Sequence, residues 1–92
     1  MKLPKSFVIK GEEYSLTVAE IDDDTWGLTD DDKKTITITP NIKGKNLKLT
    51  LIHEFIHACL SELHVDLEAG VEEVIADGVA KCLLDSFQVR PK

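Results

Sequence analysis

Several features of membrane and secreted proteins are missing from this sequence. It has no apolar run near the roughly 20 residues that cross a bilayer, and its first residues lack the apolar stretch of a signal peptide. Two cysteines are too few for the disulfide framework of a small secreted domain. Cys59 and Cys82 lie in apolar helical patterns, so we expect both to be buried and unpaired. These absences favour a cytoplasmic protein with no membrane partner.

Positive charge is also scarce. The chain has 11 lysines and arginines against 17 acidic residues, a net charge of −6. Such a surface repels phosphate backbones, so we expect no nucleic-acid partner. Two acidic runs, 22–24 and 30–32, lack the ligand spacing and closing glutamate of an EF-hand, so we interpret them as solvated loops.

The first part of the chain, about residues 6–39, has the patterns of β-strands. Residues 7–9 and 14–21 flank a Lys-Gly turn and predict a hairpin. Residues 35–39 alternate strictly between threonine and isoleucine, and Pro40 ends this third strand. We therefore expect a three-stranded sheet of the antiparallel type.

After residue 47 the apolar period becomes that of an α-helix. A first helix is expected at about 47–63, and a second at about 69–87. Gly78 within the second helix suggests close helix packing, because glycine is otherwise unfavourable there. The apolar stripe of the first helix contains Leu49, Ile52, Ile56, Cys59, Leu60 and Leu63, with Phe55 at its edge. The apolar positions of the second are Val71, Val74, Ile75, Val79, Cys82, Leu83 and Phe87.

These elements predict one α+β domain over residues 1–92, a sheet followed by two packed helices. A domain of this size buries only a little more than ~60% of its unfolded surface, so its core is limited. A bound metal ion would help to stabilise the folded state of such a small domain.

A His-Glu-x-x-His pattern occupies residues 53–57 of the predicted first helix. Residues four apart on a helix lie one above the other, so His53 and His57 point the same way. Two stacked imidazoles can converge on one zinc ion, which takes imidazole nitrogen at about 2.0 to 2.1 Å. Glu54 lies beside them but out of register, where a side chain can take a proton from an attacking water without binding the metal. The pattern predicts a zinc site with Glu54 as general base.

Such a zinc ion needs a third protein ligand. If the chain turns back at about residue 65, His57 lies eight residues before the turn and Glu73 eight after it, at about the same height. Glu72 projects nearer the middle of the apolar arc, where a carboxylate would also need a metal or a partner. Geometry favours Glu73 and leaves Glu72 open. Asp77, one turn beyond Glu73, could accept the outer N–H of a ligand histidine.

Residues 53–58 and the segment Glu73-Val74-Ile75-Ala76-Asp77 together resemble the signature of gluzincin zinc metallopeptidases. The resemblance covers roughly residues 26–84 and includes small phage or prophage peptidase-like proteins and ImmA/IrrE-type domains. It implies a minimal zincin core that binds Zn²⁺ through His53, His57 and Glu73. It also implies Glu54 as the catalytic residue and Asp77 as the outer partner of a ligand histidine. A phage-encoded member would act in the host cytoplasm.

The sequence has no counterpart of the second subdomain that supplies substrate pockets in thermolysin-like enzymes. Any group that stabilises the transition state must then come from this chain, and His64 and Tyr14 are the obvious candidates. The simpler interpretations are that His64 is a polar loop residue and that Tyr14 packs its ring in a strand. Trp26, the single tryptophan, is interpreted as a core residue.

Two functions follow from these observations. The first is a zinc metallopeptidase acting on a protein or peptide, which could lie along residues 35–39 if that strand forms a sheet edge. The alternative is a zinc-stabilised binding module with little or no activity, for example a phage protein that acts on a host partner. Retention of Glu54 favours the enzyme, whereas the small size of the chain favours the module.

Overall fold

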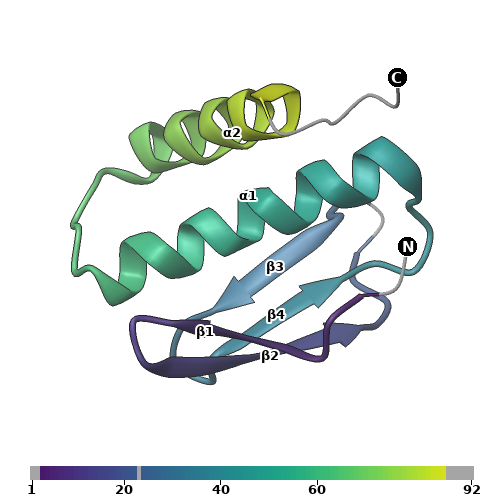
Figure 1. Ribbon diagram of the computed structural model, residues 1–92, viewed down its shortest axis with the longest axis horizontal. Coiled ribbons are helices and arrows are strands. Elements are labelled where there is room, and N and C mark those ends of the chain that lie inside the picture. The colour runs from purple at the N-terminus through teal and green to yellow at the C-terminus, as the bar shows by residue number, and fades with distance from the viewer. Residues whose placement is uncertain (1–2, 23, 87–92) are drawn as a thin grey trace.

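The computed structural model describes residues 3–22 and 24–86, which form an α+β structure in three layers. One helix covers the sheet, and the second helix lies on the first (Figure 1). The elements are β1 (Ser6–Ile9), β2 (Glu12–Val18), β3 (Gly27–Asp30), β4 (Thr35–Ile38), α1 (Gly44–Glu62) and α2 (Ala69–Ser86). The expected α+β class is therefore confirmed. The predicted end of the second helix, at residue 87, lies outside the described residues.

The sheet is mixed and has four strands in the order β1-β2-β4-β3, so the prediction of three antiparallel strands is wrong. β1 and β2 form the expected hairpin, whose turn residues Lys10 and Gly11 both have positive φ, as a two-residue hairpin turn requires. β2 pairs with β4 in parallel, and β3 pairs with β4 antiparallel.

The unpredicted strand is β3, which runs from Gly27 to Asp30. The sequence of β3 does not have the pattern of a strand, because it begins with glycine, ends in an acidic run and contains a single apolar residue, Leu28. This side chain is 53% exposed. Pairing with β4 holds it in the sheet. As a result β4 is a central strand, and the idea that residues 35–39 form a free edge is wrong.

One face of the sheet carries the core. Tyr14 of β2 and Ile36 and Ile38 of β4 are fully buried, and side chains of α1 pack against them. The interpretation of Tyr14 as a strand residue with a packed ring is confirmed. The strict alternation of β4 is thus explained by one face that meets α1.

Helix α1 is the middle layer and packs on both sides (Figure 1). Its buried residues are Thr50, Glu54 and Ala58, which lie on its sheet side. The predicted stripe is therefore rotated away from the observed core face, and Leu63, its last member, is 57% exposed. A single apolar stripe describes a helix with one buried side, which α1 is not.

Helix α2 packs on α1 through small side chains, since its buried residues are Ala76 and Ala80. Gly78 points elsewhere, because a Cβ built there meets no atom within 4 Å, and the prediction of close packing at Gly78 is wrong. The predicted burial of Cys82 is also wrong, because this side chain is exposed, whereas Cys59 is partly buried, and both thiols are free.

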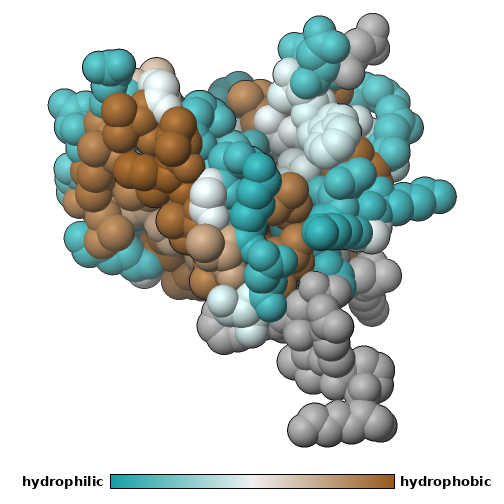
Figure 2. All heavy atoms as spheres, turned by 90° about the horizontal axis from the view of Figure 1, so that it is seen from above, coloured by the Kyte–Doolittle hydropathy of each residue, from teal (hydrophilic) through white to brown (hydrophobic). Residues whose placement is uncertain are grey.

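Most of the apolar side chains predicted to form the inner face of α2 remain partly exposed. Figure 2 looks onto the helical side of the molecule, where apolar side chains gather toward the end at which α1 and α2 are connected. The exposed apolar side chains of the two helices and their connection include Leu63, Val65, Val71, Val74, Ile75, Val79 and Leu83. Neither helix of the described part has both the length and the apolar composition that a membrane crossing requires.

Candidate metal centre

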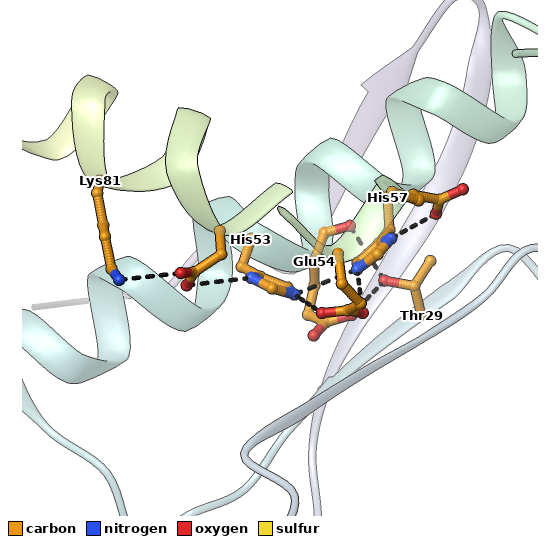
Figure 3. Close-up of polar contacts among 8 residues, drawn as sticks. Thr29, His53, Glu54, His57 and Lys81 are labelled. Atoms are coloured by element: carbon orange, nitrogen blue, oxygen red, sulfur yellow. Dashed lines mark hydrogen bonds and ion pairs between the residues drawn. The ribbon is translucent and has the colours of Figure 1, made fainter. Parts of the chain in front are cut away.

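The two histidines of α1 point toward α2 and approach each other through the same ring atom. His53 Nε2 and His57 Nε2 lie 3.2 Å apart, and both side chains are largely buried (Figure 3). The spacing of four residues on one helix brings the two rings together, and they meet edge to face, with an angle of 61° between their planes. The outer nitrogens, Nδ1, point away from the shared position and contact other residues.

Glu73 of α2 completes a group of three donors. Its Oε1 lies 2.9 Å from His57 Nε2, and its Oε2 lies 3.2 Å from His53 Nε2. Ligands held tetrahedrally at about 2.0 to 2.1 Å from a zinc ion stand ~3.3 to 3.4 Å apart, so the three donors have nearly the required spacing. Two imidazoles and one carboxylate are also a donor set that zinc prefers. The residues present therefore fit zinc.

Glu72 takes a different place from Glu73. Its Oε2 lies 2.5 Å from His57 Nδ1, on the outer side of that ring, and its side chain is largely buried. A carboxylate in this position fixes the orientation of the ring and favours the tautomer that leaves Nε2 free to bind a metal. Sequence reasoning considered Glu72 only as an alternative ligand. The signal that could have found this role is the step of about 100° between neighbouring helical residues.

Asp77 lies near the outer nitrogen of the other histidine, at a longer distance. Its Oδ1 is 4.0 Å from His53 Nδ1, while its Oδ2 forms an ion pair with Lys81 Nζ at 2.9 Å (Figure 3). The Lys81 ammonium lowers the pKa of the Asp77 carboxyl. Asp77 is thus placed on the expected side of His53, and its shorter contact is to Lys81.

Glu54 lies beside the histidines but faces the sheet. Only 8% of the residue is exposed, and the hydroxyl of Thr29 in β3 donates to Glu54 Oε1 at 2.7 Å, with the backbone oxygen of Glu54 3.0 Å away (Figure 3). The approach of β3 depends on Gly27, where an added Cβ would stand 2.8 Å from both Glu54 Cγ and Thr50 Cγ2. Sequence reasoning missed Thr29 and Gly27 because it missed the strand that carries them.

Two cavities meet at this group. The larger, of about 600 Å³, extends toward the C-terminal end of α1, and the smaller, of about 360 Å³, is lined by Trp26 and Leu49. Both are lined by Gly27, Glu54 and Glu73. Open space therefore lies on two sides of the three donors. Trp26 is 46% exposed, so its interpretation as a core residue is wrong.

The two candidates for stabilising a transition state lie in different surroundings. Tyr14 is fully buried and donates a 2.6 Å hydrogen bond to Glu62. Burial, helped by this contact, raises the pKa of Tyr14 to about 12. Tyr14 lines neither of the two cavities at the donor group, whereas His64 lines the larger one.

His64 owes its position to the end of α1. Its φ is 56°, and the N–H groups of His64 and Val65 donate to the carbonyls of Ser61 and Leu60, which is a Schellman ending. Glycine is the usual residue at this left-handed position, so the sequence carries no signal for it. The interpretation of His64 as a polar loop residue is confirmed, and this residue also lines the larger cavity.

Comparison of the chain with protein-family models, with curated proteins and with solved structures finds no match. The chemistry of this site therefore has to be inferred from its own residues.

Proposed function

We propose that this protein is a zinc-dependent metallopeptidase of the gluzincin type, in which His53, His57 and Glu73 hold the ion. One observation carries the proposal: three donors suited to zinc converge, while the buried carboxylate of Glu54 lies beside them outside the donor set. Structural zinc sites are normally closed by four protein ligands, and catalytic sites keep one position open. A three-membered donor group in the described residues supports the catalytic kind.

When bound, the zinc ion would polarise the scissile carbonyl and lower the pKa of a water molecule. Glu54 would accept a proton from the attacking water and pass it to the leaving amine. Thr29 orients the Glu54 carboxylate through its hydrogen bond to Oε1. Glu72 holds the ring of His57 from its outer nitrogen, which keeps the inner nitrogen available.

An extended substrate would lie along β3. This strand, and not residues 35–39 as the sequence suggested, forms the edge of the sheet on this side. The Thr39 N–H donates to the Trp26 carbonyl at 2.9 Å, and hydrogen-bonded pairs alternate along an antiparallel ladder. The backbone groups of Gly27 and Thr29 therefore face the free edge of the sheet. These groups lie beside the two cavities, so a peptide could pair with the edge and extend to both sides of Glu54.

The test is hydrolysis of an unfolded protein by the zinc-loaded chain, with Glu54→Gln as the matched variant. We expect the variant to keep its zinc and to lose activity by about 10²- to 10⁴-fold, because the base is removed while the three ligands remain. Zinc content is measured on both proteins before the assay. Equal hydrolysis by the two proteins would exclude the catalytic role of Glu54, and loss of zinc from the variant would make it structural.

A second candidate is a zinc-stabilised binding module without activity. It is favoured by the small side chains that α2 buries, Ala76 and Ala80, and by the origin of the proposed ligands from both α1 and α2, so that a bound ion would join the two helices. An ion bound only to the folded state stabilises it by RT ln(1 + [L]/Kd), about 4 kcal/mol at 1,000 times Kd.

Removal of the ion with a chelator should therefore lower the melting temperature substantially. Melting is followed by circular dichroism, with zinc removal verified by metal analysis and zinc added back as the control. A lower melting temperature together with no hydrolysis would favour the module. An unchanged melting curve after verified removal would count against it.

A further inference from the structure

The larger cavity carries more negative charge than the proposed reaction uses. Its lining includes five carboxylates and neither lysine nor arginine. The reaction assigns a role to three of these, with Glu54 as the base, Glu73 as a ligand and Glu72 as the partner of His57. The other two, Asp31 and Asp66, remain without a role.

Asp31 is held at the wall of this cavity by the end of α1. It follows directly after β3, and Ser61 donates a 2.9 Å hydrogen bond to its Oδ2. Asp66 comes from the connection between α1 and α2 and lines the same cavity. Within the described residues, neither carboxylate forms an ion pair with a lysine, arginine or histidine.

A bound divalent ion would leave this surplus in place. Its two positive charges offset those of Glu54 and Glu73, whereas Glu72 has a hydrogen-bond partner in Nδ1 of His57. The negative charges of Asp31 and Asp66 are then offset neither by the ion nor by an ion-pair partner, and both residues line the cavity beside Glu54 and Glu73. Ammonium and guanidinium groups are their complement, because hydrogen bonds between opposite charges are shorter and stronger than neutral ones.

We propose that Asp31 and Asp66 select substrates with a lysine or arginine side chain close to the scissile bond, on the side of the larger cavity. This inference rests on the proposed peptidase function. A free N-terminal amine offers the same chemistry, but the second cavity continues on the other side of Glu54 and Glu73, with Trp26 and Leu49 in its wall. A chain that passes through both cavities presents a side chain, not a terminus, to Asp31 and Asp66.

The experiment uses N-terminally acetylated peptides of one sequence. A single position is occupied by lysine, glutamine or glutamate, and this position is varied along both sides of the cleaved bond. At the selective position, kcat/KM should be at least ~10-fold higher for lysine than for glutamine and lower still for glutamate. The double variant Asp31→Asn with Asp66→Asn should lose this preference. Asp85→Asn, which removes a charge at an exposed position of α2 outside both cavities, should keep it.

Equal kcat/KM for the lysine and glutamine peptides at every position would overturn the selection and leave the peptidase function standing. The same peptides with a free N-terminal amine are assayed alongside, and a preference seen only in that set would also overturn the selection, since the recognised group would then be a terminal amine.

Binding gives a readout that does not need turnover. Trp26 is the only tryptophan and lines the neighbouring cavity, so its fluorescence can report titration of Glu54→Gln with the same peptides. We expect the lysine peptide to bind at least ~10-fold tighter than the glutamine peptide, and the double aspartate variant in this background to bind both alike. If no peptide is cleaved, the peptidase proposal fails, and equal binding of the two peptides would then overturn the charge selection as well.

Discussion

Two adjacent glutamates of α2 approach the same histidine from different sides. Glu73 reaches His57 Nε2 at 2.9 Å, and Glu72 reaches Nδ1 of the same ring at 2.5 Å. Neighbouring residues on a helix differ in direction by about 100°, so one carboxylate joins the donor group and the other supports the ring from outside. One turn of α2 therefore places one carboxylate at the inner nitrogen of His57 and another at its outer nitrogen.

The first prediction concerns zinc content after three substitutions. Glu73→Ala should lose zinc almost entirely, because it removes one of three donors. Glu72→Ala should weaken zinc by ~10- to 100-fold, as is typical when the outer partner of a ligand histidine is removed. Asp77→Ala should have a smaller effect, since its carboxylate is 4.0 Å from His53 Nδ1 and pairs with Lys81.

Zinc affinity is measured on the three purified variants by competition with a chromogenic chelator. From the sequence alone, Asp77→Ala would be the more damaging of the last two, so the order is diagnostic. A Glu72→Ala protein that binds zinc less well than Glu73→Ala would show that the ligand is Glu72.

At the scale of the elements, Gly27 allows β3 to approach α1 closely. Gly78 of α2 has no such role, because no neighbouring atom lies where its side chain would be. A Cβ at position 27 would stand 2.8 Å from two side-chain carbons of α1, whereas a Cβ at position 78 would meet nothing within 4 Å. Both residues are glycine in the sequence, so only the packing distinguishes them.

Gly78→Ala should therefore stabilise the protein by up to about 1 kcal/mol, the difference in helix propensity between the two residues. Gly27→Ala should destabilise it by roughly 1 to 3 kcal/mol, because the added methyl group forces Glu54 or Thr50 to move. Urea unfolding of both variants and the native chain measures the two changes. A destabilised Gly78→Ala protein would mean that α2 packs against something at this position.

At the scale of the whole molecule, a polar cluster joins the sheet to the end of α1. Glu62 accepts a hydrogen bond from Tyr14 of β2 and pairs with Lys34, whose ammonium also lies 5.5 Å from the centre of the Tyr14 ring. Lys34 lies directly before β4, so the cluster connects three elements that are far apart in the sequence. It also positions the end of α1 that borders the larger cavity.

This cluster predicts a loss of stability at alkaline pH. Burial raises the pKa of Tyr14 from 10.0 to about 12, so above pH 10 the unfolded chain releases this proton while the folded chain retains it. The free energy of unfolding should fall between about pH 10 and 12, by about 2 to 3 kcal/mol for this group.

Urea unfolding at pH 9, 10, 11 and 12 measures this fall. Tyr14→Phe lacks the titrating hydroxyl and should show a smaller decrease over the same range, although Lys34 also titrates there. A decrease of the same size in Tyr14→Phe would assign the effect to other groups.

Local patterns determined much of this protein. The spacing of His53 and His57 places them on the same side of any helix, and the alternation in β4 separates its two faces whatever lies beside it. The height of Glu73 follows from the length of chain between two antiparallel helices. For these features, neighbouring residues are sufficient, because helix and strand geometry acts over a few positions.

Only the tertiary structure decided which faces are covered and what each polar group meets. The contact between Thr29 and Glu54 spans 25 residues, and it exists because β3 pairs with β4 under α1. The buried side of α1, the free edge of the sheet and the place of Glu72 at His57 depend in the same way on distant partners. Periodicity shows which residues share a face, but the partner that covers a face is set by the packing of the whole chain.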